Sequence, residues 1–144
     1  MKIESILATK SLNVITVRPD QSLKDAIDLL VEHDIGALIV VDELGQPVGI
    51  ISERDIIREA ARTETLLSQT VDRVMTKDLI VASPEDDLGA VLQTMIARHF
   101  RHLPIVDQER LIGVISIRDV LKVQLDEYQG EVDTLQTQIT ERQD

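Results

Sequence analysis

The stretch Gly49-Ile50-Ile51-Ser52-Glu53-Arg54-Asp55 returns later in the chain as Gly113-Val114-Ile115-Ser116-Ile117-Arg118-Asp119. In each copy a Gly is followed by two apolar, β-branched residues, which favour a strand. Each then reaches a Ser with an acid three residues later, which is the pattern of a helix start. Each copy therefore predicts a strand that leads directly into a helix, and the return of the stretch indicates an internal repeat.

The repeat extends over most of the chain. A shift of 65 residues aligns the apolar and proline positions of the two halves, and after a one-residue deletion a shift of 64 aligns the two quoted stretches. Hydrophobic periodicity predicts strand, helix, strand, strand and helix in each half. The first unit has expected strands at 14–17, 37–41 and 48–51, a helix that is capped by Asp20 or Ser22 and ends near 34–36, and a second helix from Ser52. The second unit has expected strands at 80–81, 103–106 and 111–115 and helices at 88–97 and from Ser116.

The predicted fold class is α/β (α+β), with two pseudo-symmetric β-α-β-β-α repeats packed sheet to sheet and a C-terminal helix. A small sheet with helices on one face leaves its other face apolar, and the second copy can bury that face. The expected division is 1–63 for the first repeat with its lead-in, 64–73 for a linker, 74–123 for the second repeat and 124–144 for a C-terminal amphipathic helix.

The composition excludes several classes of protein. The 144 residues include no Cys, one Phe and one Tyr, and the formal charge is −11. Without Cys there is no disulfide framework or Cys-ligated zinc. An acidic chain with so few aromatic residues is poorly suited to nucleic acid. No apolar run approaches the roughly 20 residues of a membrane-spanning helix, so we expect a cytoplasmic protein without a membrane or nucleic-acid partner.

The repeated motif has two interpretations. A Ser followed by an acid at the third position forms a capping box, which stabilises a helix start and binds nothing. Both copies also carry an Arg beside the helix N-terminus, where free backbone N–H groups favour anions. A nearby Asp carboxylate can accept hydrogen bonds from the two hydroxyls of a ribose. A sugar next to a phosphate indicates a nucleotide.

The two G-x-x-S-x-x-D motifs, the apolar strands before them and the tandem spacing resemble a pair of CBS domains, the regulatory unit called a Bateman module. The resemblance covers the chain from about Ile6 to Val123. The chain is most similar to the small bacterial stand-alone CBS-domain proteins. This resemblance implies a non-enzymatic sensor that binds AMP, or alternatively ATP, ADP, NAD(H) or S-adenosylmethionine, in clefts between the repeats. An unidentified regulated protein would respond to the bound ligand.

The resemblance also implies the residues of the two clefts. Asp55 and Asp119 match the ribose-binding acid, Ser52 and Ser116 the neighbouring hydroxyl, and the two motif arginines the phosphate-binding residues. The cleft with Asp119 is expected to contain Val114, Ser116, Arg118 and Asp119, with Thr9, Asn13, Val14, Ile35, Gly36, Ala37, Arg101 and His102. The cleft with Asp55 is expected to contain Ile50, Ser52, Arg54 and Asp55, with Thr76, Lys77, Ile80, Phe100, Arg101 and His102.

A basic cluster distinguishes the second repeat from the first. This cluster is Arg98-His99-Phe100-Arg101-His102. Its last three residues align with the uncharged Ile35-Gly36-Ala37 of the first repeat. Either these residues form a solvated helix end, whose negative pole favours cations, or they face phosphates. Metal binding by the two histidines is a weaker third reading, because no carboxylate set accompanies them, and no metal site is expected.

The C-terminal residues carry an apolar stripe. Leu121, Leu125, Tyr128, Val132, Leu135 and Ile139 are spaced alternately by four and three, as in the seam of a coiled coil. Gly130 weakens this helix by about 1 kcal/mol relative to Ala. We expect a homodimer, either through this seam or through the helices of the repeats. The alternative is an amphipathic helix folded back on its own domain.

Two other functions compete with a nucleotide sensor. In the first, the motifs are helix caps only and the chain is a dimeric structural or interaction module without a ligand. In the second the chain is an enzyme, which is disfavoured because it contains no HExxH, GxSxG, P-loop or long dinucleotide fingerprint.

Overall fold

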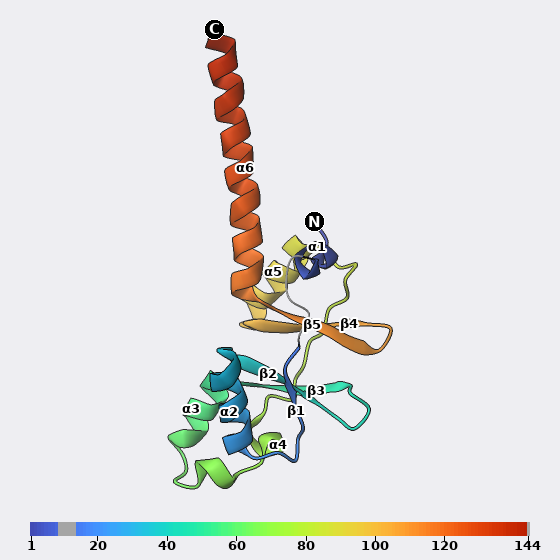
Figure 1. Cartoon of the computed structure of the whole chain (residues 1–144), viewed down its shortest axis with the longest axis vertical. Helices are drawn as coiled ribbons and strands as arrows, with labels where there is room; N and C mark the ends of the chain where they lie inside the picture. Colours follow the sequence, from blue (N-terminus) through green and yellow to red (C-terminus); the bar gives the residue numbers. More distant parts are fainter. Residues whose placement is uncertain (9–13, 144) are drawn as a thin grey trace.

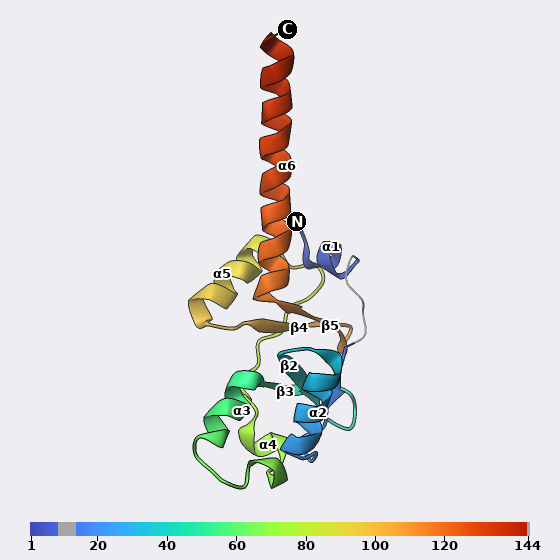
Figure 2. The same cartoon turned by 60° about the vertical axis from the view of Figure 1, so that its left-hand side comes forward.

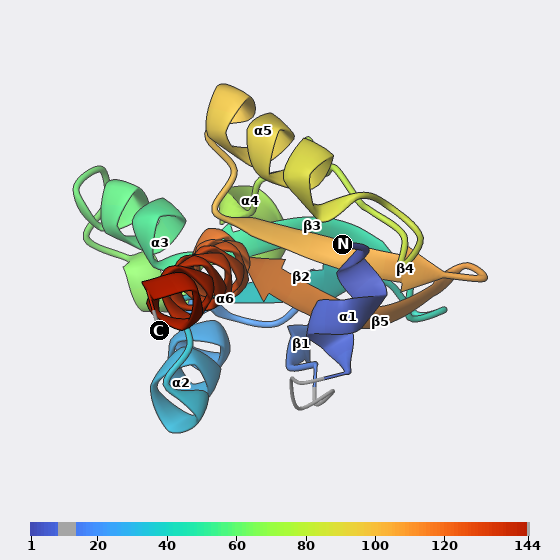
Figure 3. The ribbon, with the colours of Figure 1, turned by 90° about the horizontal axis from the view of Figure 1, so that it is seen from above.

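The computed structural model describes residues 1–8 and 14–143, with side chains described as far as residue 136. The two repeats stack with their sheets facing each other and their helices outside (Figure 1). Seen along the C-terminal helix, β4 and β5 lie over β2 and β3 (Figure 3). The predicted sheet-to-sheet arrangement of two α/β repeats is thus confirmed.

The first repeat forms a three-stranded sheet in the order β1-β2-β3, in which β2 is parallel to β1 and antiparallel to β3. Ser22 begins the first of its helices by accepting a hydrogen bond from the Asp25 N–H, and Asp34 ends that helix in the left-handed conformation. Its elements are β1 (Thr16–Val17), α2 (Leu23–His33), β2 (Ala37–Val41), β3 (Pro47–Ser52) and α3 (Glu53–Ala60).

The central strand β2 is buried on both faces, as its continuous apolar run predicts. Leu38 and Val40 point into the core beneath the helices of the first repeat. Ile39 points to the opposite face and is 1% exposed. That face is turned toward the sheet of the second repeat (Figures 1 and 2). The apolar face left by each small sheet is therefore covered by the other repeat.

The second repeat contains one correction to the predicted elements. No strand forms at 80–81; a single residue, Ala82, pairs with β4 through bonds to the Pro104 carbonyl (3.0 Å) and from the Val106 N–H (2.8 Å). Pro104 occupies the position that Ile39 holds in the first repeat, and it has no N–H to donate the next ladder bond toward residue 80. The elements are α5 (Leu88–Arg98), β4 (His102–Asp107), β5 (Arg110–Ser116) and α6 (Ile117–Gln143).

The segments that precede the two repeats are exchanged between them. The first is α1 (Ile3–Leu7), whose Ile3, Ile6 and Leu7 are buried in the core of the second repeat. The second comprises η1 (Leu66–Ser68) and α4 (Val71–Val74), which pack on the core of the first repeat. Each repeat is thus completed by a lead-in that belongs, by sequence order, to the other.

Matching backbone bonds hold the two lead-ins. The Leu88 N–H donates to the Met1 carbonyl, and the Leu23 N–H donates to the Gln69 carbonyl, both at 2.8 Å. Because Leu23 and Leu88 each open the first helix of a repeat, the exchange follows the same pseudo-symmetry as the sequence repeat.

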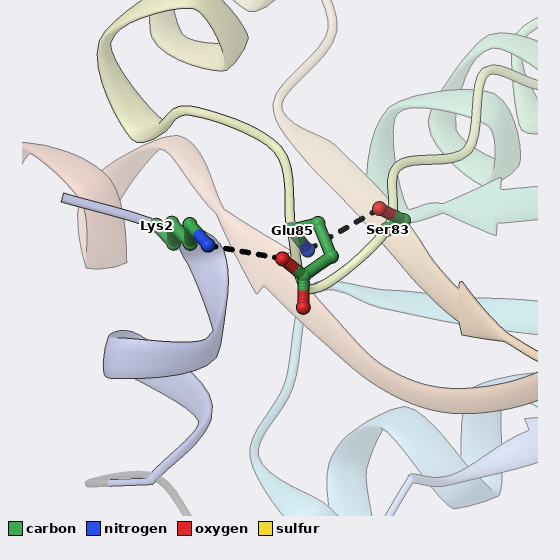
Figure 4. Close-up of polar contacts among 3 residues, drawn as sticks. All are labelled: Lys2, Ser83 and Glu85. Carbon is green, nitrogen blue, oxygen red and sulfur yellow. Dashed lines mark hydrogen bonds and ion pairs between the residues drawn. The ribbon is translucent and has the colours of Figure 1, made fainter.

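The N-terminal lead-in also makes a surface ion pair. The Lys2 ammonium donates to a Glu85 carboxylate oxygen at 3.0 Å, and the Glu85 N–H donates to Ser83 Oγ at 3.3 Å (Figure 4). The hydrogen bond and charge of Glu85 raise the pKa of Lys2 above its usual value of 10.5. Because the pKa is raised on folding, the ion pair stabilises the folded state at pH values below the ordinary lysine pKa. This stabilisation is lost as the pH rises through the pKa of the folded state. This pair therefore stays intact at neutral pH.

The helix expected from Ser116 and the C-terminal segment expected at 124–144 form one continuous helix. α6 begins directly after Ser116 and runs without a break to Gln143. It projects away from both repeats (Figures 1 and 2), so it does not fold back on its own domain. None of the described helices combines the length and apolarity that crossing a bilayer requires.

The exchange of lead-ins predicts a large cost for truncating Ile3, which is fully buried in the core of the second repeat. Ile3→Ala removes buried methyl groups and leaves a cavity, so the free energy of unfolding should fall by about 2–5 kcal/mol in urea titrations. Leu44→Ala is the control, because Leu44 is 83% exposed. Equal, small effects of both variants would contradict the docking of α1.

Candidate functional site

The first motif forms a complete capping box at the start of α3. The Asp55 N–H donates to Ser52 Oγ at 3.3 Å, and Asp55 Oδ2 accepts from the Ser52 N–H at 3.0 Å and from Ser52 Oγ at 3.1 Å. Both residues are half-buried. The reciprocal bonds fix the Asp55 carboxylate at the junction of β3 and α3.

The second motif repeats this geometry at the start of α6. The Ser116 N–H donates to Asp119 Oδ2 at 2.8 Å, and the Asp119 N–H donates to Ser116 Oγ at 3.0 Å. The capping interpretation of the sequence is therefore physically correct for both motifs. Capping does not exclude ligand binding by the same carboxylates, because a carboxylate accepts about four hydrogen bonds.

The lead-in of the second repeat reaches the first motif. Thr76 Oγ1 donates to Asp55 Oδ1 at 3.3 Å, and the backbone of Thr76 exchanges two hydrogen bonds with Ile50, at 2.8 and 3.0 Å. Thr76, Ile50 and Asp55, which were assigned to one cleft, are thus brought together from both repeats. The corresponding residues of the other cleft, Thr9 and Asn13, lie outside the described residues.

The glycine of each motif lies where the exchanged lead-in crosses the strand. A Cβ added at Gly49 would lie 2.7 Å from Met75 Sδ and 3.0 Å from the Thr76 carbonyl oxygen. A Cβ added at Gly113 would lie 2.9 Å from Leu7 Cδ2. These close approaches were not anticipated from the sequence, although a glycine at the same place in both copies was a signal of a steric requirement.

The residues before β2 and β4 lie beside the motif of their own repeat. The Glu53 N–H donates to the Gly36 carbonyl at 3.0 Å, and the Ile117 N–H donates to the Arg101 carbonyl at 2.8 Å. In the strand register Ala37 pairs with Ser52 and His102 pairs with Ser116. Gly36 and Ala37, assigned from the sequence to the Asp119 cleft, are thus direct neighbours of the first motif.

The remaining assigned residues surround these junctions. Val14 and Ile80 are half-buried just before the first pairing residue of each repeat, and Ile35 and Phe100 are half-buried just before β2 and β4. Lys77 is exposed directly after Thr76, and Val114 pairs with Pro104 within the second sheet.

The two motif arginines lie in the first helical turns of α3 and α6. Arg54 and Arg118 are exposed, and neither forms a hydrogen bond or ion pair within the described part of the chain. Each places an exposed positive charge beside a helix N-terminus, where the positive pole of the helix already favours an anion. This combination suits a phosphate group.

The basic cluster divides between two environments. Arg98 and His99 form the end of α5, where Arg98 lies 5.6 Å from the centre of the Phe100 ring and His99 adopts a left-handed conformation. His102 instead begins β4 opposite Ser116. The interpretation as a helix end therefore fits Arg98 and His99, whereas His102 borders the second motif. Among the described residues no group of three or more acids and histidines could hold a metal ion.

A cavity of about 270 Å³ lies between α5 and residues 80–87. Of the assigned site residues only Ile80 and Phe100 line it, so it is separate from the Ser–Asp junctions. Thr94 lines the cavity at the position where the first repeat has Leu29, which packs against the core. The two repeats therefore differ in side-chain size at this position.

Comparison with known proteins is consistent with this geometry. The family model "CBS domain" matches residues 3–62 and 71–126. An uncharacterized 17.7 kDa protein of Acidianus ambivalens is 35% identical over 126 residues, which are 87% of this chain and 74% of that protein. A CBS-domain containing protein from Agrobacterium tumefaciens is 35% identical with a TM-score of 0.81, covering 85% of this chain and 92% of that chain.

One similar structure contains ligands. The CBS domain pair of protein MJ0100, in complex with methylthioadenosine and S-adenosylmethionine, is 27% identical with a TM-score of 0.79; 88% of this chain and 98% of that chain are covered. Other curated relatives are longer, and this chain spans 32%, 39% and 21% of three of them, one a dehydrogenase.

The surroundings of two glycines predict opposite effects on stability when each is replaced by alanine. Gly49→Ala forces Met75 and Thr76 away from β3 and should lower the free energy of unfolding by about 1–3 kcal/mol. Gly130→Ala lies in α6 with open space around it and should raise helix stability by about 0.5–1 kcal/mol. Urea titrations measure both; a neutral Gly49→Ala would show that the lead-in does not need the missing Cβ.

Proposed function

The chain belongs to the CBS-domain family, and we propose that it is a cytoplasmic regulatory protein that binds an adenosine-containing ligand at its two Ser–Asp junctions. AMP is the first candidate, with ATP, ADP, NAD(H) and S-adenosylmethionine as alternatives. The adenosine compounds bound by the MJ0100 pair support this ligand class. The residues proposed to line the two clefts are those assigned from the sequence.

The observation that carries the proposal is the junction at Asp55. Its carboxylate is held by the cap, is contacted by Thr76 from the other lead-in and lies one residue after the exposed Arg54. A ribose needs an acceptor for its hydroxyls, and a phosphate needs a cation and free N–H groups. The carboxylate of Asp55 and the guanidinium of Arg54 lie within one helical turn, whereas the Glu53 and Asp55 N–H groups already donate to the Gly36 carbonyl and to Ser52 Oγ. The positive pole of α3 and Arg54 therefore remain to attract a phosphate.

The same junction offers a route for signalling. A ligand bound between Asp55 and Thr76 would contact both a repeat and the exchanged lead-in. It would then favour whichever relation between the two repeats gives it more contacts, because a ligand shifts an equilibrium only by its differential affinity. We propose that the protein acts as a homodimer, that an unidentified regulated protein reads this change, and that the junctions bind without catalysing a reaction.

The alternative is a structural module without a ligand. One observation favours it: the Ser–Asp hydrogen bonds of both motifs are formed internally and stabilise the helix starts. The two functions differ in what an added adenosine compound does to stability, so a binding measurement separates them.

The test is the thermal midpoint of ligand-stripped protein with and without each candidate compound. A ligand at 100 times its dissociation constant should add about 2.7 kcal/mol and raise the midpoint by roughly 5–10 °C. The shift should be lost or greatly reduced in Asp55→Ala, Asp119→Ala or both, which identifies the occupied cleft.

The matched control is Asp87→Ala. Asp87 caps α5 through its carboxylate but belongs to neither motif. This variant should lower the midpoint without ligand and keep the ligand-induced shift. The absence of a shift with every compound, or its loss in the control as well, would count against the proposed function.

A further inference from the structure

An apolar stripe on α6 is exposed over most of its length. The exposed fractions are 49% for Leu121, 65% for Leu125, 64% for Tyr128 and 58% for Leu135, and Val132 is partly exposed. Large apolar side chains in a continuous row on a projecting helix mark an interaction surface. The side chain of Ile139, which continues the spacing, lies outside the described residues.

The globular part of the chain uses a different face of α6. Val120 is fully buried in the core of the second repeat, with Ile117 and Val123 packed against the same core. Beyond this first part, α6 extends away from the repeats (Figures 1 and 2). No described element of the same chain therefore covers the stripe, and a second molecule must do so if it is to be buried.

The charges of α6 are separated from the stripe. With Leu125 and Val132 at heptad position a and Leu121, Tyr128 and Leu135 at d, Gly130 falls at f, on the outer side. The acids Asp126, Glu127 and Asp133 fall at b and c. The flanking e and g positions hold Lys122, Gln124, Gln129, Glu131 and Gln136. In a chain with a net charge of −11, this leaves the flanks of the stripe almost neutral.

We propose that α6 pairs with α6 of a second copy of this chain as a parallel, in-register coiled coil. In a parallel pair each g residue faces the e residue of the next heptad on the other helix. Gln124 then faces Gln129 of the second copy, and Glu131 faces Gln136. No like charges meet at these flanks, which favours a second copy over an acidic or basic partner.

The direction of pairing follows from the same positions. An antiparallel pair that overlaps from residue 121 to residue 139 would be centred at residue 130. Glu131 would then face Glu131 of the second copy, and like charges at close range are destabilising. The parallel arrangement avoids this contact.

Parallel pairing has a consequence for the proposed sensor, and this step rests on the proposed ligand sites. α6 begins in the second motif, immediately after Ser116, and Asp119 lies in its first turn. A parallel coil therefore brings the Asp119 junctions of both molecules to the same end of the dimer. A ligand at this junction would act on the base of the pairing helix.

Disulfide cross-linking tests direction and register, because the chain contains no Cys. Leu135→Cys should form a covalent dimer under mild oxidation, since equal d positions of a parallel pair lie within disulfide reach. Asp133→Cys, on the outer side, is the control and should stay monomeric on a denaturing gel. In a mixture of Leu125→Cys and Leu135→Cys chains carrying different tags, covalent heterodimers should be absent. Their formation at the expense of homodimers would show antiparallel pairing and overturn the proposal.

The mass in solution distinguishes pairing through α6 from the more general proposal of a homodimer. The protein should have twice the 16.1 kDa chain mass in sedimentation experiments, and Leu125→Asp should reduce this mass to that of the monomer. A dimer that survives Leu125→Asp would leave the homodimer standing but place its interface on the repeats, which would contradict pairing through α6. Ligand-induced thermal shifts, measured on the same samples, report on the adenosine sites independently.

Discussion

The structure depends on the exchange of two short lead-ins between the repeats. Each small sheet has one face covered by its own helices and the other by the second repeat, and each core is closed by a segment that precedes the other repeat in the sequence. The crossings need room at the strands, which Gly49 and Gly113 supply by lacking a side chain. The exchange also brings Thr76 to Asp55, so the arrangement that builds the fold also builds the candidate site.

Most secondary structure follows from local pattern and from the repeat. Of the two expected caps, Asp20 and Ser22, it is Ser22 that caps the first helix. The helix start at Ser52 and the buried strand Ala37–Val41 form as capping and periodicity predict. The expected strand at 80–81 does not form, because Pro104 on the neighbouring strand has no N–H to donate to it. The propensities of residues 80 and 81 contain no information about this partner. The exchange itself joins residues far apart in the chain, such as Leu88 and Met1, and the internal symmetry alone does not specify it.

The candidate site was predictable to the extent that it is local. The Ser–Asp pairs lie three residues apart, and their geometry follows from the capping box. The contact of Thr76 with Asp55 depends on the exchange and does not follow from local pattern. The family resemblance implied only that both residues belong to one cleft. The strand register, which places Ala37 beside Ser52, emerged only with the fold. The cavity beside Thr94 lies at a position where the side chains of the two repeats differ in size.

We expect the exchanged lead-ins to make the two repeats one cooperative unit. Hydrogen exchange in increasing urea, read by mass spectrometry on peptides from β2 and β4, measures the opening free energy of each repeat separately. If each core is closed by a segment tied to the other, both strands should lose protection in one transition with the same free energy. Loss of protection in β4 at a lower urea concentration, with β2 still protected, would show that the repeats unfold independently and would contradict their coupling through the lead-ins.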